Sequence, residues 1–277
     1  MANSLRTTGL YQKNAFSLVE LLVVISTITV LISIGTPALV KARCQAKSVF
    51  CKSNIRQLVL ANICYSNDYD GFCVPAAVDM YKTTYGGNHR WHGTRTGKDA
   101  PFDPNGSPLA EYLLGGKIKE CPGMLDFVQG NVWNESFEKG CGGYGYNMAY
   151  IGSKLSKPGL TNEEKYTNTA GMAEIRKLDK TIMFADCAMS KTAGSYIEYS
   201  FAEPPHVIIS GKVYEDIFYS PSIHFRHGSY ANFAWSDAHV DSRKMLDLDS
   251  PNIYSVVSSE MMLAWPEPLD NSLFDLE

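Results

Sequence analysis

Three histidines and an aspartate near the C-terminus carry side chains that a metal centre or a hydrolytic site would use. They are His224, His227, Asp237 and His239. The His-x-x-His spacing lacks the i, i+4 separation that places two zinc ligands on one helix face, and the stretch has the pattern of a strand. We therefore expect a structural hairpin with Asp237 at its tip, and an anchored metal-dependent hydrolase is the alternative. We expect the His227 imidazole to lie near Asp237 and to bond to its carboxylate or to backbone at that tip.

The carboxylate of Glu20 is a second group that needs a chemical explanation. Glu20 is the only charged residue in the 25-residue run 16–40, which is otherwise apolar or uncharged. As a helix this run would be about 37 Å long, more than the roughly 30 Å of a bilayer core. A lone carboxylate in hydrocarbon costs on the order of several kcal/mol, so it is normally paired or functional. The run therefore predicts a membrane span with one functional charge.

Seven cysteines provide a third set of reactive groups: Cys44, Cys51, Cys64, Cys73, Cys121, Cys141 and Cys187. They form no C-x-x-C pair, which argues against a zinc knuckle. In an exported chain they can oxidise, and the odd number leaves at least one outside any internal disulfide. Cys121 and Cys141 bracket a 19-residue loop, and we predict a disulfide between them.

Two further polar stretches allow alternatives. Residues 67–71, Asn-Asp-Tyr-Asp-Gly, predict a turn that stops a helix, and the alternative is a calcium loop, although no glutamate follows at EF-hand spacing. His89, Trp91 and His92 alternate with Arg90 and Arg95, which would suit stacking on sugars or nucleic acid. Isolated surface aromatic residues explain that pattern equally well.

These groups must be positioned by one long helix and a head. After Pro37, which is expected to loosen the helix, one face of an amphipathic segment carries Cys51, Ile55, Leu58, Val59 and Ile63. We expect the helix to continue to about residue 65 or 66. The predicted organisation is a leader (1–15), a membrane-spanning half-helix (16–40), an amphipathic half-helix (41–66) and a globular head (67–277).

The head has the pattern of an antiparallel sheet with long loops. Short apolar strands separated by turn residues are expected at 181–186, 196–201, 207–209 and 231–235, and a short helix is expected at 107–116. The fold class predicted is α+β, with the long N-terminal helix packed on a mainly antiparallel sheet. A net charge of −4 over 277 residues, without a concentrated basic patch, argues against nucleic acid as a partner.

The N-terminal residues resemble the prepilin-type cleavage and methylation signal of type IV pilins and type II secretion pseudopilins. The match consists of the small residue Ala15, then Phe16, the segment 17–20 ending in Glu20, and Pro37. The resemblance implies that prepilin peptidase cuts between Ala15 and Phe16 and that Phe16 becomes a methylated N-terminus. Glycine is usual before the cut, so Ala15 departs from the family pattern.

A second stretch resembles the C-terminal motif of a large group of bacterial pilin-like proteins. Nine residues separate His227 from Asp237, as in that motif, but Ala238 stands where the group has glycine. Counterparts of other segments common in the group are residues 67–71, 121–122 (Cys-Pro) and 144–147 (Tyr-Gly-Tyr-Asn).

Together the two resemblances imply a pilin-like or pseudopilin-like subunit. It would be held in the inner membrane by a single span, with an extracytoplasmic head, and assembled with other subunits into a pilus or secretion pseudopilus. Glu20 would serve that assembly by neutralising the terminal amine of a neighbour inside an apolar bundle. We expect no catalytic residue and no cofactor. The alternative to a filament subunit or an enzyme is a membrane-tethered binding module.

Overall fold

The computed structural model describes residues 17–123, 138–192, 195–246 and 256–277, and it divides the chain into two compact units. The first unit ends at Arg43 and the second runs from Cys44 to Glu277. Within the described residues the chain is α+β, with one long helix and antiparallel sheets.

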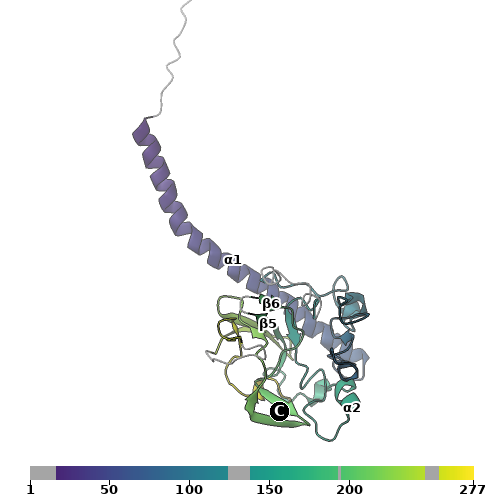
Figure 1. Cartoon of the computed structure of the whole chain (residues 1–277). Coiled ribbons are helices and arrows are strands. Elements are labelled where there is room, and N and C mark those ends of the chain that lie inside the picture. The colour runs from purple at the N-terminus through teal and green to yellow at the C-terminus, as the bar shows by residue number, and fades with distance from the viewer. Residues whose placement is uncertain (1–16, 124–137, 193–194, 247–255) are drawn as a thin grey trace, which may run out of the picture. The chain divides into compact units, whose positions relative to one another are not determined.

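Helix α1, Leu18–Asp68, is continuous over 51 residues (Figure 1). Its first part is long and apolar enough to cross a membrane, which makes α1 a candidate single-pass span. Pro37 lies inside the helix without ending it. A proline removes one backbone hydrogen bond, and a membrane helix commonly tolerates that loss.

The C-terminal part of α1 presents one buried face, as the sequence pattern predicted. Cys51, Ile55, Leu58 and Val59 are all 1% exposed or less. The helix ends at Asp68, two or three residues after the expected position and inside the predicted turn. There the Gly71 N–H donates to the Ser66 carbonyl at 2.8 Å, and Asp70 and Gly71 both have positive φ. This is the geometry of a helix C-terminal cap.

A four-stranded antiparallel sheet forms the centre of the head, with strand order β11-β10-β4-β3. Its strands are β3 (Tyr144–Tyr146), β4 (Ile182–Asp186), β10 (Tyr230–Trp235) and β11 (Val240–Lys244). All five residues of β4 are buried, which explains the continuous apolar run that marked it in the sequence. The Ser48 hydroxyl of α1 donates to the Asn232 amide oxygen of β10 at 3.1 Å, so the helix reaches the sheet.

Four two-stranded antiparallel pairs surround this sheet. They are β1 (His89–Arg90) with β2 (Gly93–Thr94), β5 (Met189–Thr192) with β6 (Ser195–Ile197), β7 (His206–Ile209) with β8 (Lys212–Phe218), and β9 (Ile223–His224) with β12 (Leu263–Ala264). A short helix, α2, spans Asn162–Thr167 and begins with a capping box between Thr161 and Glu164.

Two expectations about local structure were wrong. The helix expected at residues 107–116 is reduced to one 3-10 turn, η3 (Ala110–Tyr112). Most of the aromatic and basic stretch around Trp91 is buried and not on the surface: Trp91 and His92 are 0% exposed, and of its members only His89 is exposed. The remaining 3-10 turns are η1 (Met80–Lys82), η2 (Pro104–Gly106), η4 (Met172–Glu174) and η5 (Asn271–Leu273).

Candidate functional site

Glu20 lies in the first turn of α1 and is held by Ser17, which directly precedes the helix. The Ser17 backbone N–H and hydroxyl both donate to Glu20 Oε2, at 2.9 and 2.8 Å, and the Glu20 N–H donates to Ser17 Oγ at 3.2 Å. This reciprocal arrangement is a capping box. The Ser-x-x-Glu spacing is the sequence signal for this cap, and it is separate from the charge of Glu20. Ala15 and Phe16, the expected cleavage site, lie outside the described residues.

The polar side chains in the first part of α1 are satisfied within the helix. Each hydroxyl donates to a backbone carbonyl three or four residues earlier, over 2.7–2.9 Å, at Ser26, Thr27, Thr29, Ser33 and Thr36. Large apolar side chains are exposed along the same stretch, with Leu18 at 79% and Ile34 at 71%. A segment that satisfies its own polar groups and presents apolar ones is suited to lipid or to an apolar helix bundle.

The C-terminal motif forms a hairpin, as expected, but His227 and Asp237 do not meet. Asp237 Oδ1 accepts from the His239 N–H at 3.0 Å and lies 2.6 Å from His239 Nδ1 at the exposed tip. His227 precedes β10 and Asp237 follows it, and a six-residue strand spans about 17 Å. Ala238 at the tip has a φ of 68°, a conformation that favours the glycine of the related motif.

His227 has a different partner from the one predicted. Its Nε2 lies 3.4 Å from Asp186 Oδ2, at the end of β4, and both side chains are buried. The expectation of a pair with Asp237 was wrong because it treated the hairpin as a closed local unit, whereas β10 pairs with β4 on its other edge.

The four residues that a hydrolase would use do not lie together in one site. His224 belongs to β9 and packs edge-on against Tyr196, with ring centroids 4.9 Å apart. Burial, with Arg226 and His227 nearby, holds the pKa of His224 well below its usual value. Since Asp237 and His239 occupy the far end of β10, the set His224, His227, Asp237 and His239 makes no common site.

The predicted disulfide between Cys121 and Cys141 is replaced by one between Cys51 and Cys121, whose Cα atoms are 5.1 Å apart. Cys141 is free and buried. The Cys121 N–H does pair with the segment after Cys141, donating to the Gly142 carbonyl at 3.0 Å. The Cys121 side chain nevertheless bonds to the buried face of α1, so the disulfide ties the helix to the Cys-Pro loop.

Breaking this disulfide is expected to lower the free energy of unfolding by about 2–4 kcal/mol, because the bond closes a long loop in the unfolded chain. The change is Cys51→Ser in the full-length protein in detergent, and the measurement is urea unfolding with a metal chelator present. Cys64→Ser is the matched control, because Cys64 is a free, exposed cysteine on the same helix. Equal midpoints for the two variants would contradict the assignment.

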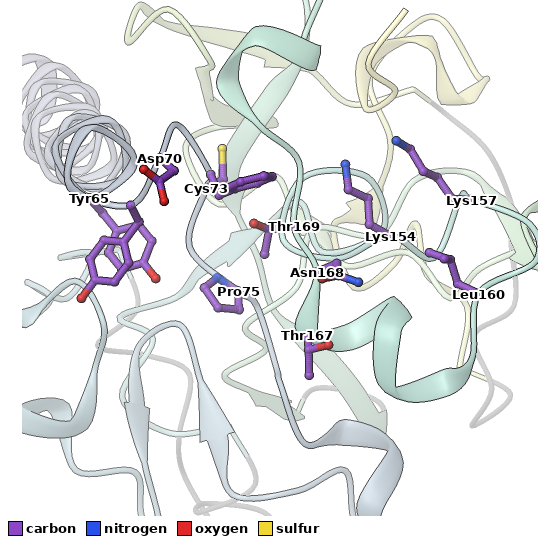
Figure 2. Close-up of a pocket in the computed structure, with 12 residues that line it drawn as sticks. Tyr65, Asp70, Cys73, Pro75, Lys154, Lys157, Leu160, Thr167, Asn168 and Thr169 are labelled. Carbon is purple, nitrogen blue, oxygen red and sulfur yellow. The ribbon is translucent and has the colours of Figure 1, made fainter.

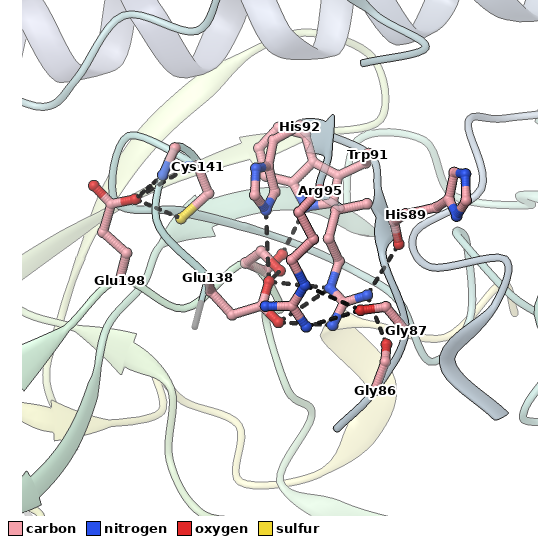
Figure 3. A network of polar contacts seen from close by, with 12 residues as sticks. Gly86, Gly87, His89, Trp91, His92, Arg95, Glu138, Cys141 and Glu198 are labelled. Atoms are coloured by element: carbon pink, nitrogen blue, oxygen red, sulfur yellow. Dashed lines mark hydrogen bonds and ion pairs between the residues drawn. The ribbon is translucent and has the colours of Figure 1, made fainter. Parts of the chain in front are cut away.

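Arg90, Glu138 and His92 form a fully buried polar network (Figure 3). Arg90 Nη2 donates to Glu138 Oε1 at 2.8 Å, and the Ser200 hydroxyl donates to Oε2 at 2.6 Å. His92 Nε2 lies 3.5 Å from Oε2. Burial alone would raise the pKa of Glu138, but the Arg90 guanidinium and His92 outweigh it and lower that pKa to about 2. Because both carboxylate oxygens are engaged, the arrangement is suited to holding the head together.

A cavity of about 530 Å3 opens beside the C-terminal end of α1 (Figure 2). Tyr65 and Tyr69 stack with ring centroids 4.0 Å apart, and Lys154 and Lys157 also line the cavity. Lys154 forms an ion pair with Glu174. The volume is within the usual range of small-molecule sites, about 300–1,000 Å3, and the lining offers aromatic faces and ammonium groups.

Comparisons of this chain with known protein families, with curated proteins and with solved structures find no match.

Proposed function

We propose that the chain is a pilin-like or pseudopilin-like subunit that prepilin peptidase cleaves between Ala15 and Phe16. Residues 16–40 would then hold it in the inner membrane. From there it would assemble with other subunits into a pilus or a type II secretion pseudopilus. The observation that carries the proposal is Glu20, the single charged residue among residues 18–40 of α1, in the first turn of a stretch that exposes large apolar side chains.

The energetics of Glu20 support a partner from another chain. The capping box supplies donors to Oε2 only, and they are neutral groups. A carboxylate in an apolar bundle requires a positive charge to offset its desolvation. Cleavage before Phe16 would create such a charge, a terminal amine, at the corresponding depth of a neighbouring subunit.

The packing of α1 in the head also supports the proposal. The buried apolar face of α1 from Cys51 to Ala61 belongs to the head's own hydrophobic core, and the disulfide adds a covalent bond at Cys51. The same helix therefore supplies both the candidate membrane span and part of the head's core.

The membrane-tethered binding module is the second candidate, and the cavity beside Tyr65 and Tyr69 favours it. Such a module would need the span but not the carboxylate of Glu20. Substitution of Glu20 therefore distinguishes the two candidate functions, because only assembly into a filament would depend on its carboxylate.

Ala15→Gly is expected to speed leader cleavage several-fold, because glycine is the usual residue before the cut and allows the closest approach of the backbone to a peptidase. The measurement is a pulse-chase experiment in cells with an active prepilin peptidase, following the ratio of full-length to shortened chain. Gly9→Ala, a change within the leader, is the control and should leave the rate unchanged. A chain that remains full-length in both variants would contradict the proposal.

A further inference from the structure

Four buried side chains with metal-binding atoms meet where α1 crosses the head. They are Cys51, Cys121, Asp186 and His227, and their ligand atoms all lie within 4.8 Å of one another. They come from α1, the Cys-Pro loop, the end of β4 and the turn before β10. In the reduced protein the cluster would offer two thiols, one imidazole and one carboxylate, which is a donor set that zinc accepts.

The distances within the cluster fit a tetrahedral ion. His227 Nε2 lies 3.6 Å from Cys121 Sγ and 3.4 Å from Asp186 Oδ2. Zinc bonds of about 2.3 Å to sulfur and about 2.0–2.1 Å to nitrogen and oxygen give tetrahedral edges of roughly 3.6 Å (S to N) and roughly 3.4 Å (N to O). The two sulfurs are bonded to each other in the disulfide, so they would have to separate for zinc to bind between them.

The carboxylate of Asp186 points independently to a ligand. Asp186 is 0% exposed, and its Oδ1 has no hydrogen-bond partner among the described residues. A buried carboxylate oxygen left without a partner is energetically costly. Its other oxygen, Oδ2, is the one that lies 3.4 Å from His227 Nε2, and it also accepts a hydrogen bond from the Asn232 N–H at 2.8 Å, which fixes the orientation of the carboxylate. A metal ligand is typically oriented by a hydrogen bond of this kind.

The backbone of Gly123 lies close to the cluster. A Cβ at Gly123 would lie 3.1 Å from His227 Cε1 and 3.4 Å from Cys121 Sγ. Glycine at this position therefore lets the Cys-Pro loop approach the imidazole closely.

We propose that in the dithiol form of the protein Cys51, Cys121, His227 and Asp186 bind one Zn2+ ion. The two thiols each release a proton to solvent, and the two thiolates, the neutral imidazole and the carboxylate each donate an electron pair to the metal, so no electron transfer is involved. Zinc and the disulfide exclude each other because both use the same two sulfur atoms. Both tie α1 to the Cys-Pro loop, and zinc would also tie them to the sheet through Asp186, so zinc takes over the role of the disulfide wherever the thiols stay reduced.

The test uses the full-length protein in detergent, reduced under argon with a phosphine, which transfers two electrons to the disulfide and becomes the phosphine oxide. After reductant removal, Co2+ is titrated as a spectroscopic probe, and Zn2+ is then added to displace it. We expect one Co2+ per chain with the strong visible bands of a tetrahedral thiolate site, and loss of these bands with Zn2+. The oxidised protein should neither bind Co2+ at this site nor show these bands.

Variants assign the ligands. Cys121→Ser should abolish the cobalt bands, and Asp186→Asn should weaken binding at least about tenfold. Cys64→Ser, which removes an exposed cysteine outside the cluster, should leave the bands intact. Because a variant can fail to fold, the thermal midpoint of the reduced wild type is measured as well, and zinc should raise it. Absence of tetrahedral bands in the reduced wild type, bands that persist in Cys121→Ser, or no zinc-dependent rise in the midpoint would each overturn the proposal.

Discussion

Glu20→Val is expected to enter the membrane and lose its leader normally, but to fall at least about tenfold in the filament fraction. Close charge pairs at interfaces contribute about 1.5–7 kcal/mol, and about 1.4 kcal/mol is already a factor of ten in an equilibrium. The physical reason is that the carboxylate neutralises a terminal amine from a neighbouring subunit, which valine cannot do. The measurement compares the subunit in sheared filaments with the subunit remaining in the membrane.

Glu20→Gln separates the charge from the capping box. Glutamine can still accept the hydrogen bonds of Ser17 at the start of α1 and so preserves the cap, but it carries no charge. We expect the glutamine variant to assemble as poorly as the valine variant. Normal assembly of Glu20→Gln would show that the cap alone matters, and normal assembly of both variants would favour the tethered binding module.

Arg90→Ala is expected to lower the free energy of unfolding by about 3–5 kcal/mol, because it leaves the carboxylate of Glu138 buried without its charge partner. Arg176→Ala removes an equally direct ion pair, with Glu277, but that pair is more than 70% exposed on both sides. Exposed pairs contribute about 0–1 kcal/mol, so the control should be nearly neutral. Urea unfolding of the full-length protein, followed by tryptophan fluorescence, measures both changes.

The same network predicts an acid-sensitive head. The pKa of Glu138 is lowered to about 2 in the folded chain, below its ordinary value of 4.5. A lowered carboxylate pKa contributes stability that is fully present above the ordinary value and is lost as the pH falls toward the folded value. The wild type should therefore lose stability between pH 4.5 and 2 more steeply than Arg90→Ala. Equal slopes, or equal urea midpoints for Arg90→Ala and Arg176→Ala, would contradict this role of the pair.

The sequence predicted those features that follow from local pattern. The length of α1, its buried face at Cys51, Ile55 and Leu58, the turn at residues 67–71 and the β10–β11 hairpin each depend on residues close together in the chain. Periodicity and turn chemistry carry that information directly.

The side-chain partners depend instead on strand order and helix docking, which local patterns do not specify. Cys121 was assigned to the nearer Cys141, although Cys51 lies 70 residues away on the face that the pattern itself had marked as buried. The hairpin pattern by itself points from His227 to Asp237, but the partner is Asp186 on β4, which pairs with the other edge of β10 and lies about 40 residues earlier in the chain. Both explanations offered for the stretch around Trp91 place its aromatic rings at the surface, whereas Trp91 is buried and the neighbouring Arg90 is buried against Glu138.

The mature N-terminus tests the proposed function most directly. The protein is isolated from membranes of cells with an active prepilin peptidase, and its N-terminal peptide is analysed by mass spectrometry. We predict a chain that begins at Phe16 and carries a methyl group on its terminal amine. A chain that retains its first 15 residues in those cells would contradict the assignment to the pilin-like class.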